Sequence, residues 1–157
     1  MSCNQQTSPL WPADNPAVIA HINLLQGIIN RLANNSASCK TWCLTLVGAL
    51  ASLAGATHVL GIITFALVPV AIFGFMDTMY LAQEKAYRDV YISVIGRIRN
   101  GSYALNEVYE ASTSLKFQHI RNALFSWAIF PVYLGLVAVY LVAYFKGWLA
   151  LLTAAAK

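Results

Sequence analysis

The C-terminal half of the sequence carries six basic side chains that could bind an anion. Lysine and arginine donate strong hydrogen bonds to phosphate oxygens, and arginine can do so with two parallel bonds. In an oligomer these side chains would be repeated around its axis. They could then form a ring that binds a nucleotide or the phosphate chain of an oligonucleotide. Duplex nucleic acid is not expected as a partner. The candidate anion-binding residues are Lys85, Arg88, Arg97, Arg99, Lys116 and Arg121.

A second interpretation of the same residues is that they fix membrane orientation. Residues 77–121 carry six basic and five acidic side chains, so their net charge is only +1. Lysine and arginine are also enriched in the cytoplasmic loops of membrane proteins, whatever those loops bind. Both interpretations stay open at this point.

No catalytic or metal-binding motif is present in the sequence. The GxSxG, HExxH, GxGxxG and Walker A patterns are missing. His21, His58 and His119 fall in three different predicted regions, and two thiols, Cys39 and Cys43, are too few for a closed zinc site. We therefore expect no enzyme activity, no metal and no cofactor.

The composition predicts that these residues are held by membrane helices. Apolar residues make up 59% of the 157 residues and charged residues 10%, against about 25% charged in soluble proteins. Residues 41–76 and 122–145 contain no Asp, Glu, Lys or Arg. A helix needs about 20 apolar residues to cross a bilayer. The fold class predicted is an all-α polytopic membrane protein with three transmembrane helices, and lipid is the expected solvent of the uncharged tracts.

The N-terminal part is predicted to precede the membrane. Residues 1–15 resemble a flexible leader, and Asn15 can cap a helix that begins at Pro16. This amphipathic helix is expected to end near residues 34–36 and either to lie in the headgroup region or to pack on its copies in an oligomer. Its apolar stripe gives the candidate oligomer-interface residues Val18, Ile22, Leu25, Ile29 and Leu32.

The remaining chain divides into a hairpin, a cytoplasmic segment and a third span. Residues 40–80 are long enough for two spans with a turn near residues 55–61, although one long buried helix is the alternative. The second span is expected to continue as a helix to Asn100-Gly101, within a cytoplasmic helical segment at residues 81–121. That segment could hold a short helix at residues 103–111 and a new helix N-cap at residues 112–114.

The third span is predicted at residues 122–146, with Pro131 as a kink. The apolar tail at residues 147–157 is too short to cross alone, so it either extends the third helix or lies at the interface. Basic residues flank the first span on its N-terminal side and fill residues 81–121, whereas the first hairpin turn has none. The positive-inside rule therefore places the N-terminus in the cytoplasm and the C-terminus outside.

Small and hydroxylated residues in the spans predict close helix packing and a possible aqueous path. Gly48, Ser52 and Ala56 recur every four positions, which allows helices to approach closely. Three spans cannot enclose a pore alone, but a symmetric homo-oligomer can. A plain bundle without a pore is the other interpretation. The candidate pore-lining residues are Thr41, Thr45, Ser52 and Thr64.

Two stretches of the sequence resemble a known family. The first is residues 25–36 followed by Lys40-Thr-Trp42, and the second is residues 75–88 followed by Tyr91. They resemble small bacterial inner-membrane proteins that act as effectors of anti-phage defence, the Hailong type being the nearest. The resemblance covers roughly residues 18–100 and does not include the third span. It implies an oligomeric channel that depolarises the inner membrane under control of a nucleotide or nucleic-acid signal made by a partner nucleotidyltransferase.

The resemblance also marks Asp77, Gln83, Glu84 and Arg88 as positions typical of the family. Asp77 and Glu84 are expected to be structural residues where the second helix leaves the membrane. Asp77 should have water or a basic side chain as its partner. The leading hypothesis is thus a ligand-gated homo-oligomeric pore. Its rivals are a membrane anchor or accessory subunit that recruits a cytoplasmic protein, and a membrane enzyme that acts on lipid.

Overall fold

The computed structural model describes residues 15–57, 59–103, 113–114 and 116–155, and all regular structure in these ranges is helical. The helices are α1 (Pro16–Thr57), α2 (Leu60–Phe65), α3 (Leu67–Arg99), α4 (Phe117–Leu124) and α5 (Phe130–Ala155). Three stretches are long and apolar enough to cross a membrane: Pro16–Thr57, Gly61–Arg99 and Phe130–Gly147. The chain is therefore an all-α polytopic membrane protein, as the composition predicts.

Helix α1 is one continuous helix, where the sequence predicted a break at residues 34–36. It begins as expected, because the Asn15 side chain accepts a hydrogen bond of 2.9 Å from the Ala17 backbone N–H. Ser36 does not end the helix, because its hydroxyl donates to a carboxylate on α3 rather than to the local backbone. Neither glycine nor proline lies between residues 28 and 47 to interrupt the helix. The predicted separate helix at residues 16–36 is thus the first half of α1.

The hairpin that follows has the predicted turn. Helix α1 ends at Thr57 and α2 begins at Leu60, so one long uninterrupted helix over this tract is excluded. Helix α3 then runs without interruption to Arg99, which confirms the predicted continuation beyond the apolar tract. It ends where expected, in a Schellman motif: Gly101 has φ +64° and the Ser102 N–H donates to the Arg97 carbonyl at 2.9 Å.

The apolar stripe of α1 packs against α3 of the same chain. Val18 and Leu25 are fully buried in one cluster with Val94 of α3 and Tyr103. Farther along the stripe Ile29 and Leu32 are also buried, and Ile22 packs against the first cluster. The prediction that this stripe lies in the headgroups or on other subunits is therefore wrong, because α3 extends far enough beyond the apolar tract to cover it.

The third span begins later than predicted. Helix α4 starts after Lys116, not at the proposed cap in residues 112–114, and it ends at Leu124. Helix α5 then starts at Phe130, so Pro131 lies in a first helical turn, where its missing N–H breaks no hydrogen bond. The expected kink at Pro131 is thus a helix start. Helix α5 continues to Ala155, so the apolar tail extends the third helix. The short helix expected at residues 103–111 falls mostly outside the described residues.

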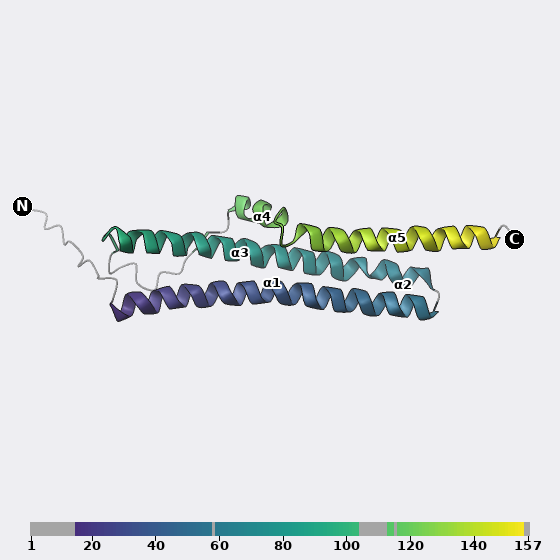
Figure 1. Cartoon of the computed structure of the whole chain (residues 1–157), viewed down its shortest axis with the longest axis horizontal. Coiled ribbons are helices and arrows are strands. Elements are labelled where there is room, and N and C mark those ends of the chain that lie inside the picture. The colour runs from purple at the N-terminus through teal and green to yellow at the C-terminus, as the bar shows by residue number, and fades with distance from the viewer. Residues whose placement is uncertain (1–14, 58, 104–112, 115, 156–157) are drawn as a thin grey trace, which may run out of the picture.

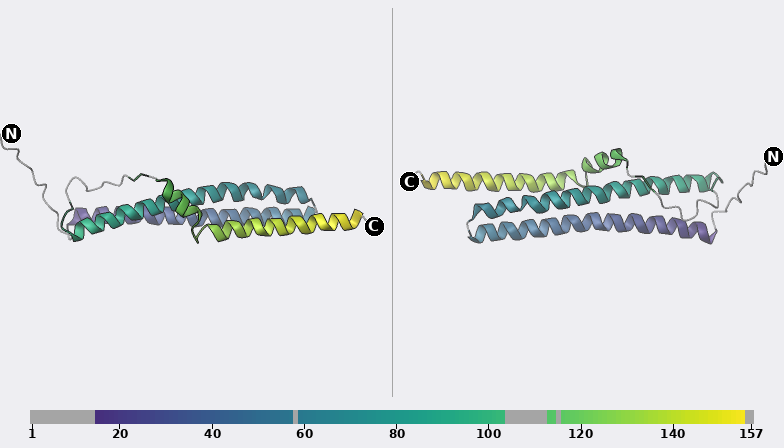
Figure 2. Two further views of the ribbon diagram at one scale, coloured as in Figure 1. Left: turned by 90° about the horizontal axis from the view of Figure 1, so that it is seen from above. Right: turned by 180° about the vertical axis from the view of Figure 1, so that it is seen from behind.

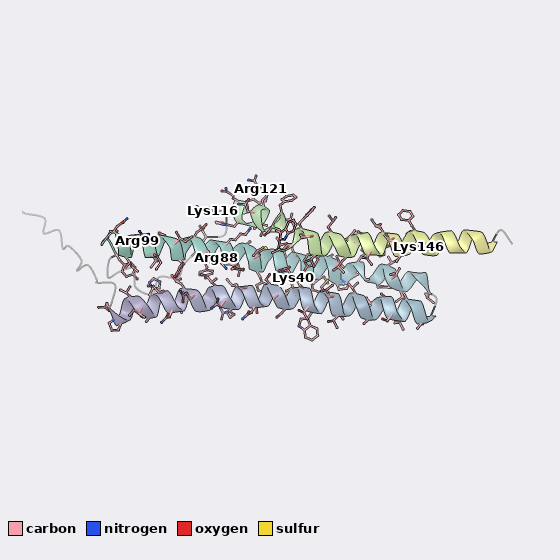
Figure 3. The ribbon with its side chains drawn as sticks, in the orientation of Figure 1. Lys40, Arg88, Arg99, Lys116, Arg121 and Lys146 are labelled. Carbon is pink, nitrogen blue, oxygen red and sulfur yellow. The ribbon has the colours of Figure 1, made fainter. Side chains whose placement is uncertain are left out.

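The helices form an elongated bundle with α3 in the middle (Figure 1). Helix α1 lies along one side of α2 and α3, while α4 and α5 lie on the other side. Two further views agree that α5 reaches beyond the turn between α1 and α2 (Figure 2). The labelled basic residues Arg99, Arg88, Lys116, Arg121 and Lys40 follow one another in the half of the bundle away from that turn, whereas Lys146 lies in the other half (Figure 3).

Candidate functional site

A buried ion pair joins α1 to α3 at the end of their uncharged tracts. Lys40 is the residue before the first tract and Asp77 is the residue after it. The Lys40 Nζ atom lies 2.7 Å from Asp77 Oδ2 and donates to Oδ1 at 2.9 Å. The carboxylate has no solvent exposure, whereas 21% of the lysine side chain is exposed. This position and partner agree with the expectation that Asp77 has a structural role at the membrane exit.

Ser36 forms a hydrogen bond with each member of this ion pair. Its hydroxyl donates to Asp77 Oδ1 at 2.5 Å and accepts a 3.0 Å hydrogen bond from Lys40 Nζ. Ser36 and Lys40 are one helical turn apart on α1, so a single face presents both groups to α3. The three side chains form one polar network, in which Asp77 Oδ1 accepts both hydrogen bonds and Oδ2 is balanced by the charge of Lys40 without a hydrogen bond among the described residues. We call Ser36, Lys40 and Asp77 the polar junction.

Helix α5 reaches the same place through Tyr133. The Tyr133 hydroxyl is buried near the Asp77 carboxylate, and it makes no hydrogen bond among the described residues. A Cβ atom at Gly74 of α3 would stand 3.3 Å from the Tyr133 ring, so glycine permits this approach. All three spanning helices therefore contribute to one polar junction. The Tyr133 contribution could not be predicted, since nothing in the spacing along α5 distinguishes this residue from Tyr140 or Tyr144.

Four of the six predicted anion-binding residues line a groove between α3 and α4. The groove consists of two adjoining cavities of about 400 and 440 Å³, which share Asp89, Lys116 and His119. Arg97 lines the first cavity, and Lys85 and Arg88 line the second. We call it the cationic groove. It lies within one chain, whereas the sequence suggested a ring around an oligomer axis.

The remaining two predicted residues are placed elsewhere. Arg99 is an exposed residue in the last turn of α3 and borders neither cavity. Arg121 is exposed on α4 and also borders neither cavity. Arg97 and Arg99 are about half a helical turn apart, which explains the first case, because residues two apart on a helix do not share a face.

Local contacts fix the basic side chains of the cationic groove. Arg88 donates to Glu84 Oε1 through Nε at 2.8 Å, an i,i+4 pair. Lys85 Nζ donates to the Asn122 carbonyl at 2.6 Å, which ties α3 to α4. His119 Nδ1 lies 3.8 Å from Asp89 Oδ2. The groove thus holds several cationic groups around one largely exposed carboxylate, and an anion could replace or bridge these contacts.

Two histidines that looked unrelated in the sequence meet at this groove. His21 of α1 and His119 of α4 both line the first cavity. His21 is buried, and its Nδ1 atom is 2.5 Å from the Tyr103 hydroxyl. The sequence could not bring them together, since the meeting depends on the length of α3 and on the packing of α4 against it. His58 lies outside the described residues.

Three of the four candidate pore-lining residues share the outer face of α1. Thr41, Thr45 and Ser52 are exposed and lie on the side of the helix opposite the buried Cys43. Each hydroxyl donates to the carbonyl four residues earlier, at 2.9–3.2 Å. Thr64 lies on α2 and is exposed, but it is not part of this face.

The same face is lined with small and polar side chains along the whole helix. A Cβ atom added at Gly27, Gly48 or Gly55 would meet nothing within 4 Å. The exposed members of this surface, which we call the α1 outer face, are Asn23, Gly27, Asn30, Asn34, Thr41, Thr45, Gly48, Ser52 and Gly55.

Comparison with protein-family models, with curated proteins and with solved structures finds no match. The conclusions on function below therefore rest on the geometry and on the sequence resemblance.

Proposed function

We propose that this chain is the subunit of a homo-oligomeric ion channel in the bacterial inner membrane. An anionic cytoplasmic ligand, a nucleotide or an oligonucleotide, controls opening, and the open channel dissipates the membrane potential in anti-phage defence. The observation that carries the proposal is the α1 outer face, which is polar, lined with small residues and not covered by any described residue. The defence role itself rests on the sequence resemblance.

The α1 outer face supports an oligomer because lipid is a poor partner for it. Small residues let membrane helices approach closely, and association in lipid depends on such packing. The hydroxyls of Thr41, Thr45 and Ser52 donate into their own helix, so their oxygen lone pairs face outward and can accept hydrogen bonds from water. A ring of subunits that turns this face inward would surround a narrow, weakly polar path.

Helix α3 joins the cationic groove to α1, the helix proposed to line the pore, and this supports ligand control. Helix α3 carries Arg97 and Lys85 of the cationic groove and, farther along, Asp77 of the polar junction. The junction joins α3 to α1, whose opposite face would line the pore. A ligand that binds the groove more tightly in one arrangement of α3 and α4 shifts the population toward that arrangement.

The orientation belongs to the same proposal. The basic residues in the half of the bundle that holds the cationic groove support a cytoplasmic position for that half (Figure 3). The N-terminus and residues 81–121 are then cytoplasmic, and the C-terminus is external. This arrangement gives the groove access to a ligand made inside the cell.

Inducible expression in a bacterial host tests the function. The native chain should slow growth and collapse the signal of a potential-sensitive dye within minutes of induction. The variant Thr45→Leu/Ser52→Leu should be inserted to the same level and leave the dye signal unchanged, because it fills the α1 outer face with apolar bulk. Val139→Leu, an exposed change on α5, serves as the matched control. An unchanged dye signal with confirmed membrane insertion of the native chain would contradict the proposal. Stable co-purification of another protein would then favour an accessory subunit.

A further inference from the structure

Large apolar side chains are exposed on α4 and on residues 125–129, the segment between α4 and α5 that we call the elbow. These side chains are Phe117, Leu124, Phe125 and Trp127, and Trp127 is 90% exposed. Phe117, Arg121 and Leu124 follow at steps of four and three, so they share one face of α4. The opposite face carries Ala123, which is fully buried against α3. We call Phe117, Arg121, Leu124, Phe125 and Trp127 the elbow surface.

The elbow surface lies at the level of the polar junction. Ala123 and Ile129 pack on Leu81 and Ala82, which follow Asp77 by about one helical turn. In Figure 3 Arg121 and Lys40 occupy neighbouring positions along the long axis of the bundle. On the far side of the bundle, exposed Trp42 is two residues from Lys40. One tryptophan on α1 and one in the segment between α4 and α5 therefore lie near the level at which the uncharged tracts end.

The charge of the surrounding chain favours an anionic surface. From residue 111 to residue 157 the sequence contains lysine and arginine but neither aspartate nor glutamate. Lys116 and Arg121 are both exposed next to the aromatic side chains. An arginine beside aromatic and leucine side chains can bury its aliphatic stem along apolar surface and keep its charged head among polar headgroups.

We propose that the elbow surface is a lipid-binding anchor at the cytoplasmic headgroup boundary. There, Trp127 and Phe125 sit among the upper acyl chains while Arg121 pairs with anionic lipid phosphates. Lipid is the occupant because the surface continues directly into α5, a candidate span with nothing buried in its apolar window. Tryptophan is enriched at this depth, since its ring is apolar and its N–H needs a polar partner. The proposal does not depend on channel function.

Depth-dependent quenching of Trp127 tests the anchor. A variant with Trp11→Phe, Trp42→Phe and Trp148→Phe keeps Trp127 as its one tryptophan. It is reconstituted in phosphatidylcholine vesicles, with and without phosphatidylglycerol. The expected result is a blue-shifted emission that is quenched more by bromine near the headgroups than by bromine near the chain ends, and little by aqueous acrylamide. If the triple variant folds poorly, the emission of Trp127 is obtained by subtracting the spectrum of Trp127→Ala from that of the native chain in the same vesicles.

The contribution of charge has its own variant and control. Phosphatidylglycerol should increase the quenching of Trp127 by bromine near the headgroups. Arg121→Ala should abolish this increase. Arg99→Ala changes an exposed arginine far from the elbow (Figure 3) and should leave the increase intact. Efficient acrylamide quenching would overturn the proposal, since the surface would then be in water. Protection from acrylamide and from both brominated lipids would overturn it too, because a second protein copy would then cover the surface.

Discussion

Lys40 of α1 and Asp77 of α3 are 37 positions apart and form an ion pair with 2.7 Å between Nζ and Oδ2. They flank the uncharged tract of residues 41–76, so each is the first charged residue that its helix presents outside that tract. The pair therefore fixes the register of the two helices at the membrane boundary. A shift of either helix by one turn would separate the charges by about 5 Å.

The two partners should respond unequally to substitution. Lys40→Met leaves a fully buried carboxylate without its cation, and the loss of a buried partner costs about 3–5 kcal/mol. Asp77→Asn should cost less, because Lys40 is partly exposed and can reach water. Thermal unfolding in detergent measures both changes. Lys146→Met, at an exposed lysine, is the control. An equal loss of Tm in the two junction variants would contradict this account.

The contact between Gly74 and Tyr133 predicts a position-specific effect of side-chain size. Gly74→Leu should push α5 away from α3, because even a Cβ atom would stand 3.3 Å from the Tyr133 ring. Overpacking of this kind costs about 1–3 kcal/mol. Gly96 lies on the same helix, and a Cβ atom added there would have no other atom within 4 Å. Gly96→Leu is therefore the control. We expect a lower Tm for Gly74→Leu alone, measured in the same detergent. Similar losses for both variants would show that the substitution harms α3 itself.

The α1 outer face predicts contact between copies of the chain. In a variant with Cys3, Cys39 and Cys43 replaced by alanine, a single cysteine at Gly48 should form disulfide-linked dimers in membranes under mild oxidation. A single cysteine at Val139 on α5 is equally exposed and should stay monomeric. Non-reducing gels give the ratio of dimer to monomer. Equal cross-linking at both positions would reflect random collision rather than an interface.

The cationic groove predicts which basic residues bind the ligand. Lys116→Ala and Lys85→Ala should each weaken binding of an anionic nucleotide, because one charge-assisted hydrogen bond contributes about 1.5–3 kcal/mol. Arg99→Ala should have little effect, since Arg99 borders neither cavity. Titration calorimetry with the purified protein measures the change. A decrease in affinity for Arg99→Ala as large as for Lys116→Ala would indicate a diffuse electrostatic effect.

The contrast between Arg97 and Arg99 shows how far the sequence could predict the site. Charge and proximity in sequence identified both residues, but only the geometry of α3 and α4 separates the one that lines the groove. Membrane character, the hairpin turn and the glycine end of α3 were predictable, because they depend on local composition and on turn chemistry. Those features need no knowledge of a distant partner.

The predictions that the structure contradicts fall where the sequence lacks the deciding signal. The break expected at Ser36 is absent because its hydroxyl bonds to Asp77, a partner 41 positions away. The stripe of Val18 and Leu25 was assigned to other subunits because the sequence does not say that α3 runs alongside it. Pro131 was interpreted as a kink because a helix start at Phe130 has no strong local capping signal. The first two errors concern long-range contacts that periodicity cannot specify, and the third concerns a helix start without a local signal.

The unequal reach of the helices has a consequence for the lipid itself. The uncharged part of α1, from Thr41 to Thr57, is only about 25 Å long at 1.5 Å per residue, and α5 extends past the turn that follows it (Figure 2). Because a hydrocarbon core is about 30 Å thick, the uncharged part of α1 is somewhat shorter than an undistorted bilayer. Thinning of the lipid beside α1 and α2 would accommodate this difference, and in the proposed oligomer such hydrophobic mismatch would favour contact between the short sides of neighbouring subunits.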